Sequence, residues 1–137
     1  MTYLYSVLAN VGDKKAFAEA DIMGNLEKLG VKSYTATEIV YGGEMAGLVV
    51  IGFEYDSVDA AMQGQAGFYQ DSELVGMMQS TQVQINRRNL FRVQAERGER
   101  RGQYGTILYI AGRPIDDATM ESNMTSIGHI SKKARTV

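Results

Sequence analysis

Hydrophobic and polar residues alternate with two different periods along the first third of the chain. Residues 2–11 are rich in Tyr, Leu and Val, which favours a strand. Gly12 and Asp13 end this run, and residues 14–29 follow a helical period. The apolar residues that share one face of this predicted helix are Ala18, Ile22, Leu26 and Leu29. Gly30 follows, where a glycine commonly ends a helix.

Two strands joined by a glycine-rich connection come next. Residues 31–41 are β-branched and aromatic, which favours a strand. Residues 42–47, GGEMAG, suit a hairpin connection, and they lack the lysine and the following helix of a phosphate-binding loop. Residues 48–55, LVVIGFEY, are almost continuously apolar. We therefore expect them to form the most buried strand of a sheet.

Two helices and a fourth strand complete the pattern. Asp56 or Ser57 is a natural N-cap for the first helix, whose helically spaced residues are Val58, Ala61, Met62 and Gln65. Asp71 or Ser72 can begin the second, shorter helix. Residues 83–93 alternate as a strand, with Val83, Ile85, Phe91 and Val93 on one parity.

This order, β-α-β-β-α-β, predicts an α+β fold of the ferredoxin-like class. We expect a four-stranded antiparallel sheet in the order 4-1-3-2, with both helices on one face. The strand 48–55 is expected inside the sheet rather than at its edge.

The C-terminal third begins the pattern again. Residues 104–111 suit a strand, and a turn leads into a helical stretch from Asp117 to about Ser131. We therefore expect residues 1–95 to form the ferredoxin-like unit and residues 96–103 a charged linker. Residues 104–137 are then the β-α start of an incomplete second repeat, packed with the first unit or with a partner chain.

Composition narrows the classes of function. The chain has 137 residues, no cysteine and a formal net charge of −2. The absence of cysteine excludes disulfides and thiolate chemistry, and the small net charge gives no reason to expect binding to nucleic acid or to a membrane. No apolar run is long enough to span a bilayer, and the N-terminus lacks the basic region of a signal peptide. These features favour a cytoplasmic protein.

The segment YGGEMAGLVVIGFEYDSVDAAM, followed by YQDSELVGMM, resembles the dimeric α+β barrel superfamily. It is most similar to NIPSNAP-like proteins and to cofactor-free antibiotic-biosynthesis monooxygenases. In those chains a glycine-bearing hairpin leads into an apolar central strand and a capped helix, and a short D-P-E-like helix follows. Here Asp71, Ser72 and Glu73 stand at that place, with serine where proline is commoner. The resemblance covers about residues 2–93.

The resemblance implies that two ferredoxin-like sheets meet face to face around a central pocket. Some members of that superfamily form this barrel within one chain through tandem repeats. Its members include oxygenases, isomerases, haem enzymes and proteins without known activity. The fold therefore leaves the function open.

Arginines concentrate near the end of the fourth predicted strand, at Arg87, Arg88, Arg92, Arg97, Arg100 and Arg101. A solvated strand face followed by a linker accounts for most of them. Arg87, however, shares its parity with Ile85 and Phe91, and Asn89 lies on the same parity. We therefore predict that Arg87 and Asn89 line a pocket and bind an anionic ligand through hydrogen bonds.

Tyrosines offer a second set of candidates. Tyr5 lies in the first strand, and Tyr109 occupies the matching position of the second repeat. A phenol at a pocket mouth can bind or polarise a carbonyl group, although strand tyrosines more often serve packing alone.

His129 is the single histidine, and the helical period places it opposite Met120, Met124 and Ile127. We expect it to face solvent and to have no role in catalysis. A lone imidazole has no partner ligands, so we predict no metal site and no cofactor. Asp13, Asp56, Asp71, Asp116 and Asp117 stand where helix caps belong.

Two functions stay open at this point. The first is binding of a small organic or anionic molecule, with cofactor-free oxygenase or isomerase chemistry as the activity that the resemblance allows. The second is a non-catalytic homo-oligomeric assembly or interaction module. Because both faces of the strand 48–55 are apolar, we expect a homodimer or higher oligomer in which sheets meet. Residues 104–111 would then extend a sheet edge of their own chain or of the partner.

Overall fold

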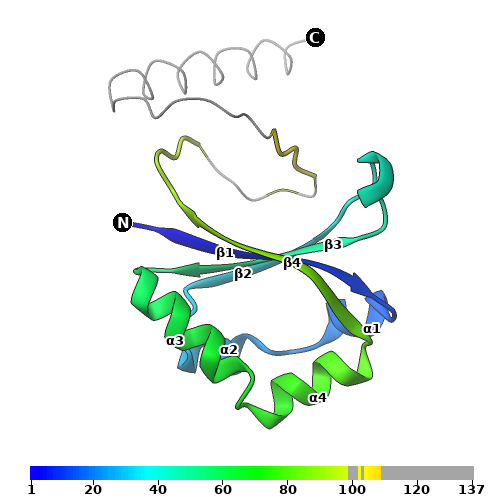
Figure 1. Ribbon diagram of the computed structural model, residues 1–137, viewed down its shortest axis with the longest axis horizontal. Helices are drawn as coiled ribbons and strands as arrows, with labels where there is room; N and C mark the ends of the chain where they lie inside the picture. The colour runs from blue at the N-terminus through cyan, green and yellow to red at the C-terminus, as the bar shows by residue number, and fades with distance from the viewer. Residues whose placement is uncertain (99–101, 103, 109–137) are drawn as a thin grey trace. The chain divides into compact units, whose positions relative to one another are not determined.

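The computed structural model describes residues 1–98, 102 and 104–108. The chain divides into two units, Met1–Val93 and Gln94–Val137. All regular secondary structure described here belongs to the first unit (Figure 1). In chain order its elements are β1 (Tyr3–Val11), α1 (Lys14–Glu19), α2 (Met23–Lys28), β2 (Ser33–Glu38), the 3-10 turn η1 (Gly43–Met45), β3 (Val49–Tyr55), α3 (Val58–Phe68), α4 (Ser72–Ser80) and β4 (Val83–Arg92).

The strands form one 4-stranded sheet in the order β2-β3-β1-β4. All three neighbouring pairs are antiparallel. The helices of this unit lie together on one side of the sheet (Figure 1). The predicted ferredoxin-like fold, the predicted strand order and the interior position of β3 are therefore confirmed.

The predicted single helix over residues 14–29 is wrong, because the chain forms two short helices there. Ala20 adopts an extended conformation with ψ of 126° and ends α1, and α2 begins only at Met23. Because of this break, residues of α1 and α2 no longer follow one continuous helical period. Phe17 is consequently buried, whereas Ala18, which we assigned to the apolar face, is exposed.

One face of the sheet, which we call the covered face, packs against the helices. Its central residues alternate along β1 and β3, and they are Val7, Ala9, Val11, Val49, Ile51, Phe53 and Tyr55. The helices contribute Phe17, Leu26, Ala61, Phe68 and Leu74 to the same core. We call the opposite side the open face. It carries Leu4, Leu8 and Val50, which are partly buried, and Phe91, which is 43% exposed.

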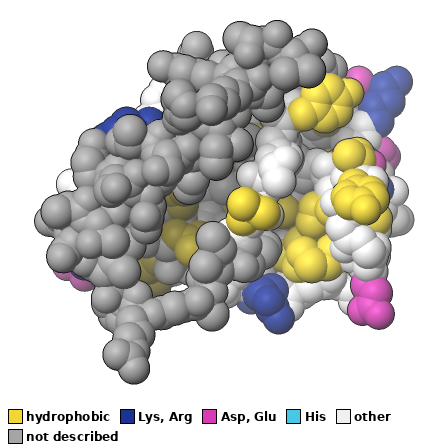
Figure 2. Space-filling view, turned by 90° about the horizontal axis from the view of Figure 1, so that it is seen from above, with side chains coloured by type: hydrophobic (Ala, Val, Ile, Leu, Met, Phe, Trp, Pro, Cys, Tyr) yellow, Lys and Arg dark blue, Asp and Glu magenta, His cyan; other side chains and the backbone are white. Residues whose placement is uncertain are grey.

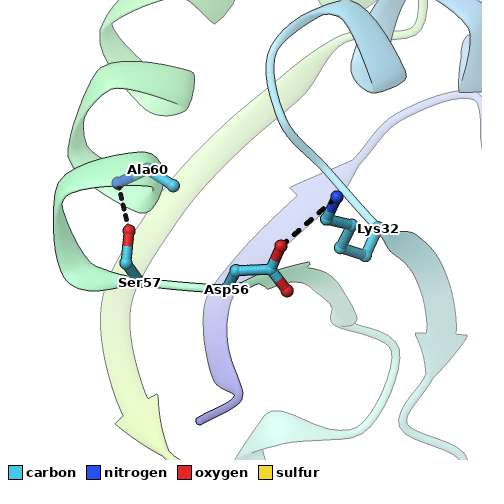
Figure 3. Close-up of polar contacts among 4 residues, drawn as sticks. All are labelled: Lys32, Asp56, Ser57 and Ala60. Carbon is cyan, nitrogen blue, oxygen red and sulfur yellow. Dashed lines mark hydrogen bonds and ion pairs between the residues drawn. The ribbon is translucent and has the colours of Figure 1, made fainter.

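The start of α3 follows the predicted capping pattern (Figure 3). The Ser57 hydroxyl accepts a hydrogen bond from the backbone N–H of Ala60 at 3.0 Å. Asp56, one residue earlier, pairs with the Lys32 ammonium at 3.3 Å. Both side chains of this pair are more than half exposed, so it contributes little to stability. The serine cap is what fixes the first turn of the helix.

Helix α3 approaches the sheet closely through Gly64. A Cβ atom at this position would lie 2.6 Å from Cε1 of Tyr55 and 2.7 Å from the backbone oxygen of Leu29. The residues that α3 buries are Ala61, Gly64 and Phe68, whereas Val58 and Met62 are 43% and 48% exposed. The predicted apolar stripe of this helix was therefore only partly correct.

A β-bulge in β4 changes which side chains share a face. Leu8 pairs with Arg87 and the next residue of β1, Ala9, pairs with Ile85, so Asn86 is an extra residue on β4. Because of this insertion, Ile85 lies on the covered face and Arg87 on the open face. The prediction that Arg87 shares a face with Ile85 is therefore wrong, although Arg87, Asn89 and Phe91 do share one.

Residues 104–108 carry no helix or strand in the structure, and their large apolar side chains, Tyr104, Ile107 and Leu108, are exposed. The remainder of the predicted C-terminal strand and helix, including Tyr109 and His129, lies outside the described residues. That element stays a prediction. Among the described residues, no helix has both the length and the apolar character that crossing a membrane requires.

Candidate functional site

The structure separates the four residues that the sequence grouped as candidate ligand contacts. Tyr5 lies on the covered face, where it pairs with Phe53 on one side and Leu90 on the other. Arg87 and Asn89 are exposed on the open face, opposite Leu8 and Ser6. Tyr109 lies outside the described residues. Tyr5 therefore shares a face with neither Arg87 nor Asn89.

Arg88, and not its neighbour Arg87, lies on the covered face. It pairs across the ladder with Val7 and reaches the residue that follows α3. Its Nη2 donates a hydrogen bond to the Tyr69 hydroxyl at 2.7 Å, and its guanidinium carbon lies 5.9 Å from the centre of the Tyr69 ring. Because the Tyr69 oxygen accepts this bond, its own proton remains available to donate to another group.

Electrostatic contacts link this pair to Tyr5. The hydrogen bond that Arg88 donates to Tyr69 is the main reason why the pKa of Arg88 is raised, and the guanidinium is a cation at any physiological pH. Burial raises the pKa of Tyr5, and the nearby charge of Arg88 opposes that rise. Tyr5 therefore stays a neutral phenol beside a fixed positive charge.

A small cavity lies between the covered face and the helices. Its volume is about 30 Å³, enough for one or two water molecules. Apolar side chains from β1, β3, β4, α1 and α3 form most of its wall, and α4 contributes Met77 and Met78. The polar residues that line it are Tyr34, Gln65 and Tyr69. Tyr69, which is 47% exposed, therefore stands at the border of an apolar cavity, and Arg88, which is bonded to it, is exposed and does not line that cavity.

An aromatic series crosses this cavity from Tyr34 on β2 to Tyr69. The ring centres of Tyr34 and Phe53 are 5.8 Å apart, those of Phe53 and Phe68 6.1 Å, and those of Phe68 and Tyr69 5.6 Å. The last two contacts are edge-to-face, a favourable arrangement for aromatic rings. Burial alone raises the pKa of Tyr34 to about 12, so its hydroxyl stays protonated at neutral pH.

Gln65 and Tyr55 form a second polar contact in this layer. The Gln65 amide nitrogen donates to the Tyr55 hydroxyl at 2.8 Å. Burial raises the pKa of Tyr55, and this hydrogen bond partly offsets the rise. Tyr55 is only 1% exposed, so Gln65 satisfies a hydroxyl that burial would otherwise leave without a partner.

The part of the chain that the structure describes contains no cluster of three or more His, Asp or Glu side chains able to hold a metal ion. The polar groups at and beside the cavity are phenols, the Gln65 amide and the Arg88 guanidinium that is bonded to Tyr69. Such groups bind and polarise oxygen atoms of a ligand by hydrogen bonding and charge.

The sequence indicated one of these residues, Tyr5, and missed Arg88, Tyr69 and Tyr34. Arg88 was missed because its facing depends on the bulge at Asn86, which no local pattern announces. Tyr34 could have been found from the sequence. It alternates along its strand with Thr35 and Thr37, so the aromatic ring falls on the face opposite the polar threonines, where a buried side chain is expected.

No protein-family model and no curated protein matches the chain. Among solved structures, SnoaB, a cofactor-independent oxygenase from Streptomyces nogalater, is similar at a TM-score of 0.46 and 11% identity, over 69% of this chain and 95% of that one. A candidate antibiotic biosynthesis monooxygenase from Deinococcus radiodurans is similar at a TM-score of 0.38 and 13% identity, over 82% of this chain and 100% of that one. At these values the similarity says nothing about activity. The ferredoxin-like fold of the first unit is established by its own strand order and by the helices on one face.

Proposed function

We propose that this protein binds a small, mostly apolar molecule that carries an anionic or carbonyl oxygen. The observation that supports this most directly is the exposed Arg88–Tyr69 hydrogen bond of 2.7 Å, because Tyr69 also lines an apolar cavity. The cavity would take the apolar body of the ligand, and the guanidinium and the phenol proton of Tyr69 would take its oxygen.

Binding requires the cavity to enlarge, because about 30 Å³ holds only water. Met77 and Met78 are the side chains most able to yield. Both are partly buried and line the cavity, and methionine is unbranched and changes rotamer easily. A planar ring would then lie beside Phe53 and Phe68, whose edge-to-face contact provides an aromatic wall.

The test uses 2-naphthoate, an aromatic carboxylate, as the probe in isothermal titration calorimetry. We expect Arg88→Met to weaken binding at least about tenfold, since a hydrogen bond to a charged group contributes about 1.5–3 kcal/mol. Arg87→Met is the matched control, because Arg87 is the adjacent residue on the opposite face. It should leave the affinity unchanged.

Two results would contradict the proposal. The first is no binding of 2-naphthoate at millimolar concentration to the wild-type chain. The second is an equal loss of affinity for 2-naphthoate in Arg88→Met and Arg87→Met, because a general effect of positive charge would then explain the binding.

The same polar groups could also support cofactor-free chemistry. A guanidinium and a phenol proton directed at one oxygen stabilise the negative charge that develops when a carbonyl compound becomes an enolate. Solvent hydroxide is the base that removes the α-hydrogen, and the solvent returns a deuteron to the same carbon. We therefore propose that the site accelerates exchange of the α-hydrogens of a bicyclic ketone, 2-tetralone, in deuterated water. Proton NMR would follow the exchange, which should slow in Arg88→Met and persist in Arg87→Met. No acceleration over buffer would leave binding as the only supported role.

The open face supports a second candidate function, homo-oligomeric assembly. Leu4, Leu8, Val50 and Phe91 form an apolar group on this face, and no helix of the first unit lies there (Figure 1). Figure 2, which looks onto the side of the sheet opposite the helices, shows hydrophobic side chains on the described surface. Because water disfavours a continuous apolar area, we propose that two sheets meet through their open faces.

Light scattering coupled to size-exclusion chromatography tests this assembly at micromolar concentration. We expect the wild-type chain to elute as a dimer or larger, and Leu8→Glu to shift it to a monomer. Met62→Glu is the control, because Met62 is 48% exposed on α3, away from the sheet. A monomeric wild-type chain would remove this candidate.

A further inference from the structure

We infer that a groove between α2 and α3 binds a small N-acyl amino acid, a molecule that carries a carboxylate and an amide close together. The groove has a volume of about 370 Å³. Small-molecule sites commonly have volumes of about 300–1,000 Å³, so this groove can hold such a ligand without rearrangement. It shares no lining residue with the cavity on the covered face, and the inference is therefore independent of the proposed function.

Two segments of the chain form the groove and are held close to each other. The end of α2 and the middle of α3 contribute its lining residues, which are Lys28, Leu29, Gly30, Ala60, Gln63 and Gly64. Leu29 packs tightly against α3. A Cβ atom at Gly64 would lie 2.7 Å from the backbone oxygen of Leu29, and one at Gly67 would lie 2.7 Å from its Cδ2. These contacts fix the spacing of the two segments, so little free energy is spent in ordering them when a ligand binds.

Each segment brings one polar side chain to the groove. Lys28 lies at the end of α2 and Gln63 lies on α3, and both are exposed. Among the residues that the structure describes, neither side chain forms a hydrogen bond or an ion pair. Both are therefore available to a ligand, one as a cation and the other as an amide.

The chemistry of these two side chains defines the ligand. Of the described residues that line the groove, Lys28 is the one that carries a charge, and its ammonium favours a carboxylate. The Gln63 amide both donates and accepts hydrogen bonds, so its best partner is a group that also does both. An amide meets this requirement, whereas an ester only accepts.

The rest of the lining suits a small acyl group. Ala60 and Leu29 provide apolar carbon, and Gly30 has no side chain to obstruct the groove. A Cβ atom at Gly30 would meet no atom within 4 Å, so the space over this residue is open. A short acyl group fits beside these residues.

The experiment titrates the full chain with N-acetylglycine and follows the backbone amides of Gly30 and Gly64 by two-dimensional NMR. We expect saturable shifts at millimolar concentration. Acetoxyacetate, in which an ester oxygen replaces the N–H, should bind about threefold more weakly, because one hydrogen bond is lost. N-acetylglycinamide, which has no charge, should also bind about threefold more weakly, since an exposed ion pair contributes little more than this.

Two variants assign these preferences to their side chains. Lys28→Met should remove the preference for N-acetylglycine over N-acetylglycinamide, and Gln63→Met should remove the preference for the amide over the ester. Lys15→Met and Gln79→Met are the controls, because both residues are exposed and lie outside the groove. They should keep both preferences, and the spectra show directly whether each variant is folded.

Three results would overturn the inference. The first is that N-acetylglycine at millimolar concentration shifts neither glycine amide. The second is that either preference survives its own variant. The third concerns the source of the ligand, because the C-terminus of a peptide carries the same two groups: acetyl-alanyl-alanyl-glycine should bind no more tightly than N-acetylglycine, and tighter binding would replace the small molecule by a peptide end.

Discussion

Arg87 and Arg88 are adjacent in the chain, yet they lie on opposite faces of the sheet and have different surroundings. Both side chains are exposed, but Arg88 donates to Tyr69, a residue that lines the apolar cavity, at 2.7 Å, whereas Arg87 lies on the open face opposite Leu8. The difference comes from strand alternation, and the single extra residue Asn86 decides which arginine points which way. One inserted residue thus places Arg88, and not Arg87, within reach of Tyr69.

The two faces also differ in how they are packed. The covered face holds the core, with Phe53 only 5% exposed among the rings of Tyr34 and Phe68. The open face holds a smaller apolar group in which Phe91 is 43% exposed. Within the first unit the covered face therefore carries most of the stability.

The largest expected effect compares the two phenylalanines. Phe53→Ala should lower the free energy of unfolding by about 3–5 kcal/mol, because it removes a buried ring and leaves a cavity. Phe91→Ala should cost about 1 kcal/mol in the monomer, because much of that ring is already in water. Urea unfolding followed by circular dichroism measures both.

The protein concentration serves as the control in this experiment. If open faces associate, the cost of Phe91→Ala should increase with concentration, while that of Phe53→Ala should stay the same. Equal losses for both variants at low concentration would show that the two faces are packed alike and would contradict the difference in burial between Phe53 and Phe91.

A smaller effect tests how closely the helices approach the covered face. Gly64→Ala should destabilise the chain by about 1–3 kcal/mol, because the added carbon would lie 2.7 Å from the backbone oxygen of Leu29. Gly76→Ala on α4 meets no atom within 4 Å, so it should stabilise by about 0.5–1 kcal/mol. Thermal unfolding measures both variants. A lower melting temperature for Gly64→Ala together with a higher one for Gly76→Ala would confirm the close contact, and a higher melting temperature for both variants would contradict it.

Most of the architecture could be predicted because it depends on local signals. Alternation identified the strands, and the caps at Ser57 and Asp71 were among the predicted positions. The break near Ala20 could not be predicted, since neither glycine nor proline marks it. The polar contact between Asn25 and Asp71, far apart in sequence, also had no local signal.

The candidate site was less accessible to prediction, because it depends on which side chains from four different elements meet. Arg88 comes near Tyr5 and Tyr69 only through the sheet order and the bulge, and Tyr34 joins the cavity from the opposite edge strand. Parity counted along β4 without the bulge selects Arg87 in place of Arg88. Strand pairing had to be known before the residues of the site could be assigned.

A pH titration tests the burial of the covered face at Tyr34. Its pKa is raised to about 12, whereas a tyrosine in the unfolded chain ionises near 10. Burial therefore favours the neutral form, so its contribution to stability is complete below about pH 10 and is lost as the pH rises toward about 12. Absorbance at about 295 nm, where phenolates absorb, should show a late ionisation step that Tyr34→Phe removes. If Tyr34→Phe instead removes an ionisation step at lower pH, the hydroxyl of Tyr34 is not buried.

The smallest expected effect concerns the cap of α4, the helix that brings Met77 and Met78 to the covered face. Asp71 accepts hydrogen bonds from Asn25 and from the backbone N–H groups of Glu73 and Leu74. The bond from Asn25 contributes most to holding the pKa of this carboxyl below its usual value.

Because the pKa of Asp71 is lower in the folded chain, its charged carboxylate stabilises the fold. This stabilisation is complete at pH values above the pKa of an aspartate in the unfolded chain, about 3.9. It is lost as the pH falls through the lower pKa of Asp71 in the folded chain. Asn can still cap the helix but does not titrate. The urea midpoint of the wild-type chain should therefore fall further between pH 7 and pH 3 than that of Asp71→Asn, by a small margin because the group is solvent-exposed. Asp21→Asn, at an exposed residue between α1 and α2, is the control and should follow the wild type. If Asp71→Asn and the wild type lose the same stability on acidification, the hydrogen bonds of the cap do not depend on the charge of Asp71.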